Sequence, residues 1–487
     1  MSKSKTEKEN SSMDLENSSA ESNKTKTKTK TIAVIGGGYY GCHTALQLAK
    51  AGHKVKIIES KPKIFAGISG KFAARIHGGS HYPQDYETRI ACRLGLAEFV
   101  EVYGDLVVHL SHAHYVLGSK DADNLPPKVS VEAFKAVGEE CNGYKLINPD
   151  DFGYTNTLVS MEVDEPCAYI GERLRNTFIR LLEEAGVEIC YNLEVRSIRK
   201  QDEKMLINNL DQFDHVVNTT SFKAFQPNLK LPFDFSYRYQ PCVVLIYEDQ
   251  EITDKYFSYT IMDGRFGCLM PRADGSEKPG DKKKYYYYHA KGTIISTEDS
   301  FDKAKQSFSK VNDEFVEKNM RPEFESEMDR FFKGFSSRFK YCGWEGEILA
   351  KANTETEFRN ALTFKDNQDI IQVFPGKINN IFAVGREVEA LITNQNILRL
   401  DRFAYVENGA LDIGIKKGLL KEANRDCSNS CSLQPYSHLL RQSKPIPIYK
   451  NLNFSCTFFD AKEEPPYDAS LQSTTPSEEY LIETFDL

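Results

Sequence analysis

The chain has 487 residues, of which 40% are hydrophobic and 27% are charged, the balance of an ordinary globular protein. This length exceeds what one hydrophobic core usually supports, so at least two domains are expected. The net charge of −8 argues against a nucleic-acid-binding protein. Apolar runs such as Cys242–Tyr247 are far shorter than the roughly 18 residues of a membrane-spanning helix, so we expect no transmembrane segment.

The first 30 residues are almost wholly Ser, Thr, Asn, Glu and Lys, with none of the apolar core of a secretion signal. We therefore predict a disordered polar tail at 1–30. The eleven cysteines are scattered, which favours reduced thiols and a cytoplasmic location. Cys427 and Cys431 form the only close pair, with no second pair nearby, so we predict no metal site.

The first predicted folded unit is a strand, a helix and a second strand. The apolar run Ile32–Ile35 is followed by Gly36-x-Gly38-x-x-Gly41, then by apolar residues at helical spacing, and by the run Val55–Ile58, which ends at Glu59. In this order the glycines allow a tight turn, close approach to a pyrophosphate and close packing of the helix on the sheet. The acid can accept hydrogen bonds from ribose hydroxyls. The unit predicts dinucleotide binding, and the alternative is a glycine-rich turn in an unrelated α/β protein.

The next stretch contains Ser69-Gly70 and then Ile76-His77-x-Gly79-x-x-Tyr82. It resembles the D-amino-acid oxidase superfamily of flavoproteins, in its glycine-oxidase and 2-hydroxyglutarate-oxidase branch. The resemblance implies FAD, with the serine and glycine along the cofactor and the histidine loop reaching the isoalloxazine ring. The chain departs from that pattern at Phe72, where Asn is usual, and at Arg75, where a small apolar residue is common.

Later stretches agree with this resemblance. Tyr169–Ala185 is predicted as an amphipathic helix, Leu193–Ile198 as a strand near the adenine, and Asp214–Thr220 as a returning strand. Ile378–Gly385 resembles the last strand of the FAD domain, before a closing helix whose start could be Asn408–Gly414. The implied cofactor-binding residues are Gly36, Gly38, Tyr39, Tyr40, Gly41, Glu59, Ser60, Ser69, Gly70, Val195, Thr219, Gly385 and Arg386.

The expected fold is an α/β Rossmann-like FAD-binding domain of the glutathione-reductase type 2, plus a mixed, mainly antiparallel β-sheet substrate domain. The FAD domain is predicted to be discontinuous, from 31–83, 166–225 and 370–425, with the substrate domain at 84–165 and 226–369. In the substrate domain, Tyr237–Tyr247 and Tyr285–Thr297 have the composition of strands, and Thr260–Pro271 that of a strand, an Asp-Gly turn and another strand.

Two further expectations concern the surface. The tyrosines Tyr285–Tyr288 are interpreted as part of a sheet with one wet face, in preference to rings stacked over a ligand, and Ser300–Asn319 as a surface helix. The extension 426–487 is predicted to be partly disordered, with an acidic end. It is an ordinary solvated tail, a segment that binds a protein partner, or the secretion signal of an exported effector without a signal peptide.

Candidate catalytic residues lie on the histidine loop. His77 is expected at the active site, and His81 and Tyr82 either line the substrate face of the ring or are structural. Arg75 is a pyrophosphate ligand, a substrate-carboxylate ligand or a surface ion pair. Arg265 and Arg272 are further carboxylate-anchor candidates, because a guanidinium binds carboxylates bidentately. His109, His112 and His114 are interpreted as strand residues in preference to a metal cluster.

The predicted function is FAD-dependent oxidation of a small amine, amino acid or 2-hydroxy acid by hydride transfer to flavin N5. The alternatives are a flavin-dependent monooxygenase and a FAD-containing binding protein without turnover. A monooxygenase of a related two-domain fold usually carries an Asp in the late strand that here ends at Ala383-Val-Gly385.

Overall fold

The computed structural model describes residues 29–406 except 84, 142–143, 227–235, 263, 290–291, 354–358, 367, 394–396 and 401–402. The tail predicted for 1–30 therefore lies almost entirely outside the described residues. The start of a closing helix at Asn408–Gly414, the Cys427 and Cys431 pair and the extension 426–487 also lie outside them. In the described part of the chain, no helix is both long enough and apolar enough to cross a membrane.

A six-stranded sheet contains the glycine-rich motif. Its order is β19 (Leu362–Lys365), β20 (Ile371–Phe374), β13 (His215–Asn218), β1 (Thr31–Ile35), β2 (Lys54–Ile58) and β9 (Glu188–Cys190). All neighbours are parallel except the edge strand β19, which is antiparallel to β20. This is the sheet of a dinucleotide-binding fold, in which ligands bind beyond the carboxyl ends of the parallel strands.

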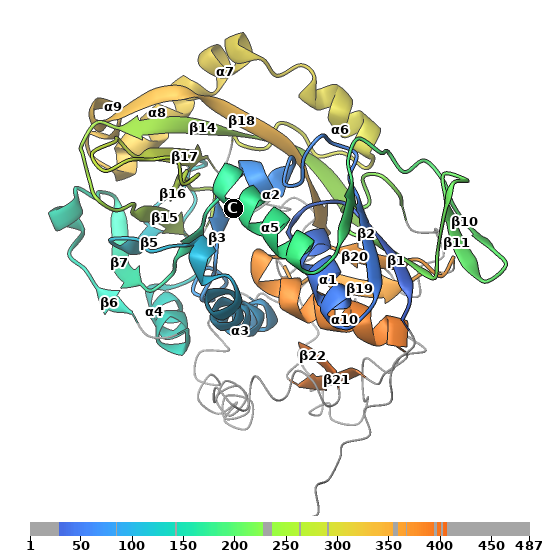
Figure 1. Ribbon diagram of the computed structural model, residues 1–487. Coiled ribbons are helices and arrows are strands. Elements are labelled where there is room, and N and C mark those ends of the chain that lie inside the picture. Colours follow the sequence, from blue (N-terminus) through green and yellow to red (C-terminus); the bar gives the residue numbers. More distant parts are fainter. Residues whose placement is uncertain are drawn as a thin grey trace, which may run out of the picture.

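Both faces of this sheet are covered (Figure 1). Ile32 and Val34 pack in one core with helices α1 (Tyr39–Lys50), α5 (Gly171–Glu184) and α10 (Ile381–Thr393). The alternate residues Ala33 and Ile35 pack in a second core beneath the meander β10 (Ile198–Gln201), β11 (Lys204–Ile207) and β12 (Asp211–Phe213). Burial on both faces explains why β1 reads as a continuous apolar run.

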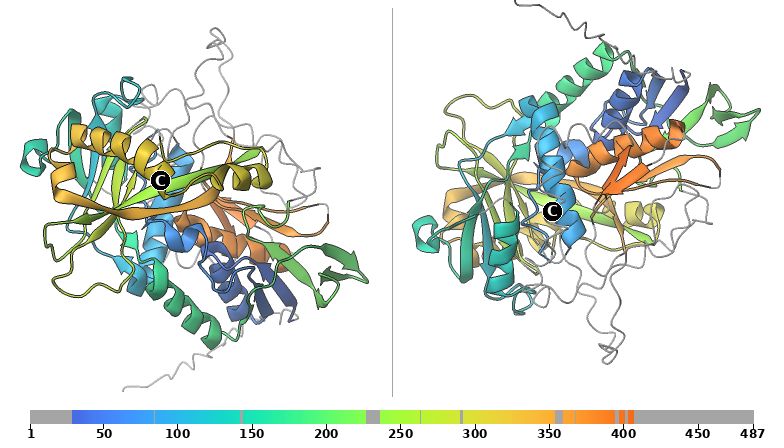
Figure 2. Two further views of the ribbon diagram at one scale, coloured as in Figure 1. Left: turned by 90° about the horizontal axis from the view of Figure 1, so that it is seen from above. Right: turned by 90° about the horizontal axis from the view of Figure 1, so that it is seen from below.

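A second, eight-stranded sheet forms the other half of the molecule. Its order is β18 (Phe339–Ala352), β14 (Tyr237–Asp249), β17 (Lys284–Tyr288), β16 (Cys268–Pro271), β15 (Ser258–Met262), β5 (Ala113–Gly118), β7 (Thr157–Val163) and β6 (Lys145–Leu146). All neighbours are antiparallel except β15 and β5. Four helices lie across it in Figures 1 and 2: α6 (Phe301–Phe308), α7 (Asp313–Asn319), α8 (Arg321–Phe331) and α9 (Phe335–Arg338).

Short elements join the two sheets. A small sheet has β8 (Cys167–Ala168) between β3 (Ala74–Arg75) and β4 (Val107–Val108). The remaining described elements are α2 (Ile68–Lys71), α3 (Tyr86–Val102), α4 (Val131–Glu140), the 3-10 turns η1 (Gly104–Leu106), η2 (Pro149–Phe152) and η3 (Ile378–Asn380), and the hairpin β21 (Ile397–Leu400) and β22 (Phe403–Val406).

The predicted fold class is confirmed, because a parallel α/β sheet and a mainly antiparallel sheet are both present. The helix α5, the returning strand β13 and the hairpin of β15 and β16 also form where they were expected. Segments from 84–165 and from 226–369 share the eight-stranded sheet, whereas β19 belongs to the six-stranded sheet. The third FAD-domain segment therefore begins before residue 370, and the rest of the domain division stays a prediction.

Three predicted elements are wrong. Ile378–Gly385 is not a strand, because η3 and then α10 occupy it, and the last parallel strand is β20. Residues 193–197 form an irregular segment before β10, so the strand predicted for Leu193–Ile198 is absent. Ser300–Asn319 contains two helices, α6 and α7, because Asn312 caps a new helix by accepting a hydrogen bond from the backbone N–H of Phe315.

The tyrosine strand β17 has no wet face. All four tyrosines from Tyr285 to Tyr288 are at most 2% exposed. Tyr287 packs against Phe324 and Phe335 from the covering helices, whereas Tyr288 on the opposite face packs against Phe72. A covered sheet buries both sets of alternate side chains, which composition alone does not reveal.

Candidate active site

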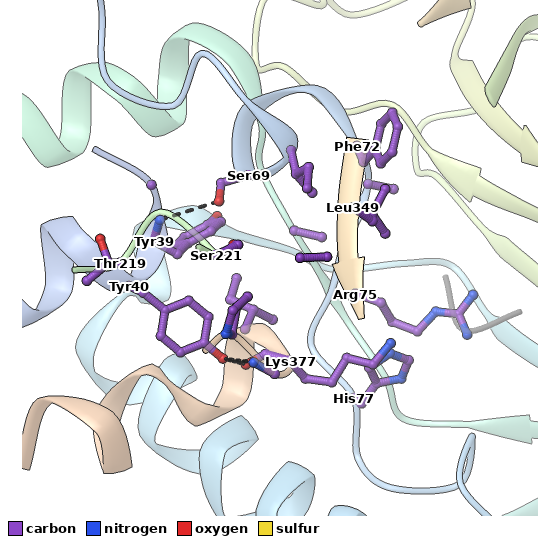
Figure 3. Close-up of a pocket in the computed structure, with 18 of the residues that line it drawn as sticks. Tyr39, Tyr40, Ser69, Phe72, Arg75, His77, Thr219, Ser221, Leu349 and Lys377 are labelled. Carbon is purple, nitrogen blue, oxygen red and sulfur yellow. Dashed lines mark hydrogen bonds between the residues drawn. The ribbon is translucent and has the colours of Figure 1, made fainter. Parts of the chain in front are cut away.

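One cavity lies between the glycine-rich motif and the eight-stranded sheet (Figure 3). Its empty volume is about 1130 Å³, including open solvent at its mouth. Its lining comes from α1, the segment 68–77, the end of β13, β17, β18 and the turn before η3. The residues that line it are Gly38, Tyr39, Tyr40, Ile68, Ser69, Phe72, Ala73, Ala74, Arg75, His77, Thr219, Ser221, Tyr288, Leu349, Ala350, Pro375, Gly376, Lys377 and Ile378.

The glycine-rich turn forms one end of this cavity. Gly36 has a φ of +103°, a conformation that side chains disfavour. A Cβ on Gly41 would lie 1.8 Å from the carbonyl oxygen of Gly36, so the turn and the helix touch there through backbone alone. Helix α1 begins at Tyr39 with no side-chain cap, and its first residues line the cavity. The N-terminus of α1 therefore offers its backbone N–H groups and its dipole to an anion in the cavity.

Polar side chains surround this turn. Glu59 follows β2 and accepts hydrogen bonds from the backbone N–H of Gly37 at 2.7 Å and of Lys61 at 2.8 Å. The Ser60 hydroxyl donates to the same carboxylate at 3.3 Å. Thr219 follows β13, and its hydroxyl donates to the carbonyl of Ile35 at 2.8 Å. The acid and the threonine thus lie at the carboxyl ends of β2 and β13, the two parallel strands on either side of β1, where this fold binds its ligand.

The segment after Glu59 folds back over the motif. Ser69 lines the cavity, and its hydroxyl accepts a hydrogen bond from the backbone N–H of Tyr39 at 3.4 Å. Gly70 does not line the cavity, and a Cβ there would lie 2.0 Å from the carbonyl oxygen of Phe65. Val195 is buried among the residues beneath β10 to β12. Its side chain supports the sheet, and the backbone contact with adenine implied for it stays a prediction.

Arg75 lies at the opposite end of the cavity, on β3. It is 6% exposed, and its guanidinium donates to the Tyr115 hydroxyl at 2.9 Å and the Thr260 hydroxyl at 2.8 Å, and contacts the sulfur of Met270. Burial by itself would lower the pKa of Arg75, but nearby Tyr115, Cys268 and Glu165 raise it above its ordinary value. Arg75 is therefore a buried cation at the cavity wall, and the surface ion pair considered for it is excluded.

His77 lies on the same loop and is 1% exposed. Its Nδ1 is 3.6 Å from a carboxylate oxygen of Glu165, a residue that the sequence did not single out. The rings of His81 and Tyr82 both pack on His77 with centroid distances of 5.1 Å. His81 and Tyr82 do not line the cavity, so they contact it through His77 and the loop.

Lys377 adds a second cation to this end, and Figure 3 shows it beside His77. Its backbone is held from both sides. The Tyr40 hydroxyl donates to the carbonyl of Lys377 at 2.6 Å, and the backbone N–H of Lys377 donates to the side-chain oxygen of Asn380 at 2.9 Å. The Pro375-Gly376-Lys377 sequence was a visible turn signal, but nothing local indicated that the turn reaches the cavity.

The residues fit FAD. A helix N-terminus without a side-chain cap, a turn that excludes any Cβ at residue 41, and an acid after the second strand form the donor set for a pyrophosphate and a ribose. Sequence comparison agrees, because residues 31–346 match the family described as FAD dependent oxidoreductase. The chain belongs to this family.

Individual relatives of this oxidoreductase carry more specific names. It is 40% identical over 369 residues to the FAD-dependent monooxygenase kojA of Aspergillus flavus, which covers 74% of this chain and 86% of that protein. It is 24% identical over 368 residues to the FAD-dependent monooxygenase FPY4 of Fusarium mangiferae, which covers 75% of this chain and 92% of that protein.

Solved structures share the fold. Glycine oxidase from Geobacillus kaustophilus superposes with a TM-score of 0.56 at 12% identity, covering 76% of this chain and 95% of that one. A Tyr258Phe mutant of NikD, described as an unusual amino acid oxidase, superposes with a TM-score of 0.55 at 13% identity, over 75% and 94% of the two chains. At these identities the likeness shows the fold alone.

Four residues that were predicted to bind the cofactor or the substrate lie outside the lining of the cavity. Gly385 and Arg386 are inside α10, where the arginine pairs with Glu98 at 2.6 Å, because their segment is helical. Arg265 pairs with Asp123 at 2.7 Å. Arg272 pairs with Glu345 at 2.9 Å and with Asp274 at 3.2 Å. None of the four lines the cavity, so their proposed contacts with cofactor or substrate carboxylate lose their basis.

The histidine run lies away from the cavity lining. His114 is on β5, and His112, just before that strand, stacks on it with ring centroids 4.2 Å apart. His109 is exposed in the segment between β4 and β5. The Nδ1 of His114 is bonded to the Tyr154 hydroxyl, and burial lowers the pKa of this imidazole to about 3. These contacts give His112 and His114 a role in packing.

Proposed function

We propose that this flavoprotein oxidises a small amine, amino acid or 2-hydroxy acid. The observation that carries the proposal is a cavity with two different ends. One end has the geometry for the FAD pyrophosphate, and the other carries Arg75, His77 and Lys377. A substrate of a few atoms, with one anionic group, suits a small polar end of this kind.

Arg75 is the group that would bind the substrate anion. Its two terminal nitrogens are engaged by Tyr115, Thr260 and Met270, whereas its buried Nε–H has no hydrogen-bond partner among the described residues. A buried donor without an acceptor is costly, and the positive charge of this guanidinium at the cavity wall would attract a substrate carboxylate. Lys377 would add positive potential at the same end.

When bound, FAD supplies the two-electron acceptor for a hydride from the substrate carbon. The protein has to fix the substrate, exclude water and accept the second hydrogen as a proton. The buried wall of Phe72 and Tyr288 excludes water, and His77 is the titratable side chain in position to exchange that proton.

A second candidate is a monooxygenase, in which one oxygen atom of O₂ enters the product. The observation that favours it is the 40% identity to a protein named FAD-dependent monooxygenase. The missing Asp in the segment ending at Gly385 no longer argues against it, because that segment is a helix and not the strand on which the argument depended.

The test is anaerobic mixing of the purified holoprotein with a panel of amino acids, N-methyl amines and 2-hydroxy acids, followed by admission of ¹⁸O₂. Bleaching of the flavin by a panel compound, with an imine- or carbonyl-derived product and peroxide on aeration, supports the oxidase. A product that gains ¹⁸O from the gas supports the monooxygenase. A flavin that only chemical reductants bleach, and no ¹⁸O in any panel compound even with a nicotinamide reductant present, contradicts both and favours a FAD-containing binding protein.

A further inference from the structure

We propose that Glu165 is a positioning residue, whose buried carboxylate holds the loop of Arg75 and His77 and keeps a proton on His77 Nδ1. The inference rests on the proposed function, because it concerns the same end of the cavity. Glu165 does not line the cavity, so it would act on the reaction only through these two residues.

The strand register explains how this residue reaches the loop. Strands β3 and β8 are antiparallel, with Arg75 opposite Cys167. Continued by two residues, this register sets Glu165 opposite His77, and the backbone bond from Ile76 N–H to the carbonyl of Pro166 shows that the pairing does continue. Glu165 thus comes from a distant part of the sequence to lie directly behind the histidine loop.

The carboxylate is hydrogen-bonded both to that loop and to the neighbouring strand β5. Glu165 is 4% exposed, and it accepts hydrogen bonds from the backbone N–H of Gly78 at 2.7 Å and from the Tyr115 hydroxyl at 2.5 Å. The loop needs such an external anchor because its next residue, Gly79, has a φ of +110° and leaves regular structure. A charge-assisted bond to a backbone N–H is among the stronger hydrogen bonds in proteins.

The same carboxylate compensates a buried charge. The Tyr115 hydroxyl accepts from Arg75 at 2.9 Å and donates to Glu165, so it joins the cation to the anion. Burial raises the pKa of Tyr115, so the phenol keeps the proton that it donates. Without the negative charge, the cation of Arg75 would be left in a buried site with no carboxylate joined to it, which proteins tolerate poorly.

The geometry also sets the state of the histidine. Nδ1 of His77 lies 3.6 Å from the carboxylate, and a nearby carboxylate stabilises an N–H on the nitrogen that faces it. The groups packed on this ring include His81 and Tyr82, while Arg75 and Lys377 lie at the same end of the cavity. Among these groups Glu165 carries the carboxylate that faces Nδ1, so its removal should change the protonation of Nδ1.

The first experiment needs no substrate. Histidine labelled with ¹⁵N is incorporated into the holoprotein, whose sequence has ten histidines, and the His77 signals are identified by their loss in His77→Gln. We expect a protonated Nδ1 in the native protein and loss of that preference in Glu165→Gln, which keeps the side-chain shape. The matched control is Glu162→Gln, which removes a carboxylate 3.9 Å from His114 on the neighbouring strand and should leave His77 unchanged. An unprotonated Nδ1 in the native protein, or no change in Glu165→Gln, overturns the proposal.

The second experiment uses turnover. Glu165→Gln should lower kcat by roughly 10²-fold while FAD affinity changes little, and the loss in kcat should be much smaller when His77 is already Ala. Equal losses in both backgrounds would show that Glu165 does not act through His77. If the native protein turns over no panel compound, the proposed function fails, but the ¹⁵N result still decides the role of Glu165.

Discussion

The two ends of the cavity are built in different ways. Most of the nucleotide end comes from one continuous stretch, Ile32–Glu59, in which turn, helix and acid follow each other along the chain, and Ser69 and Thr219 complete it. The substrate end is assembled from β3, the segment before β8, β5, β15, β17 and the turn before η3, which are far apart in the sequence. Local geometry fixes the first end, and strand register fixes the second.

This difference predicts how each end fails. A change at the nucleotide end should remove the cofactor and leave the substrate-end network intact. A change at the substrate end should leave FAD bound and alter rate or specificity. The following predictions test this separation, from the largest expected effect to the smallest.

The largest effect is expected from Gly41→Ala. The added Cβ would lie 1.8 Å from the carbonyl oxygen of Gly36 and 2.8 Å from the Thr219 hydroxyl, so the turn must move away from the helix. Overpacking of this kind costs about 1–3 kcal/mol, and here the strain falls on the pyrophosphate turn itself. We expect protein without bound FAD, measured by flavin absorbance after purification and by reconstitution.

The matched control is Gly104→Ala in η1, where a Cβ meets no atom within 4 Å. It should retain FAD at the native stoichiometry. A Gly41→Ala protein that binds FAD with native affinity would show that this contact between helix and turn is dispensable.

The second effect concerns rate at the substrate end. His77→Ala removes a buried imidazole from the cavity wall, and the loss of a group that exchanges protons with substrate lowers turnover by roughly 10²-fold or more. FAD affinity should stay within a factor of a few of native, because no atom of this residue belongs to the nucleotide end. Stopped-flow flavin reduction and FAD titration measure the two quantities, with exposed His109→Ala as the control. Native reduction rates in His77→Ala would make the histidine structural.

These two predictions also mark what the sequence could reveal. Glycines and an acid at fixed spacing in one βαβ unit predict the nucleotide end, because each requirement is met within 30 residues. The sequence did not predict Glu165 or Lys377 as site residues. The position of Glu165 depends on the register of β3 with β8, and that of Lys377 depends on a turn held by Tyr40. Neither property has a local pattern.

The start of the helix at 381–393 was wrongly predicted as a strand, because the local pattern was too short to decide. The apolar run within Ile378–Gly385 is only Ile381–Val384, and over so short a run a buried strand and a buried helix look alike. Over a longer window, the buried Ile381, Val384, Val388 and Leu391 follow helical spacing. The family resemblance favoured a strand there, and the periodicity beyond Gly385 would have corrected it.

The third effect is a loss of cofactor affinity in Glu59→Gln. The amide can still accept the bond from Gly37 N–H, but the negative charge that strengthens bonds from ribose hydroxyls is lost. A charge-assisted hydrogen bond contributes about 1.5–3 kcal/mol, so the Kd for FAD should rise roughly 10- to 150-fold. Fluorescence titration of apoprotein with FAD measures this Kd.

Glu188→Gln on the adjoining strand β9, which removes an exposed ion pair with Lys56, is the control and should leave the Kd unchanged. Equal affinities for Glu59→Gln and native protein would exclude the ribose role.

The smallest effect is expected from Tyr40→Phe, because Tyr40 connects the two ends of the cavity. The backbone of Tyr40 belongs to the glycine motif at the nucleotide end. Its hydroxyl donates to the carbonyl of Lys377 at 2.6 Å and accepts from Gly376 N–H at 3.0 Å. Burial raises the pKa of Tyr40, so the phenol stays protonated and keeps donating. Tyr40→Phe removes both bonds without changing the shape of the core, and since water can reach the half-buried turn, the cost should be about 1 kcal/mol of stability. The turn that carries Lys377 would then loosen, so we expect a several-fold lower kcat/KM with an almost unchanged Kd for FAD, measured by steady-state kinetics and cofactor titration.

Tyr39→Phe is the matched control, because the hydroxyl of Tyr39 is buried without a hydrogen-bond partner among the described residues, and its removal should not destabilise the protein. If Tyr40→Phe weakens FAD binding more than it lowers kcat/KM, the hydroxyl serves the nucleotide end, and the two ends are less separate than their construction implies.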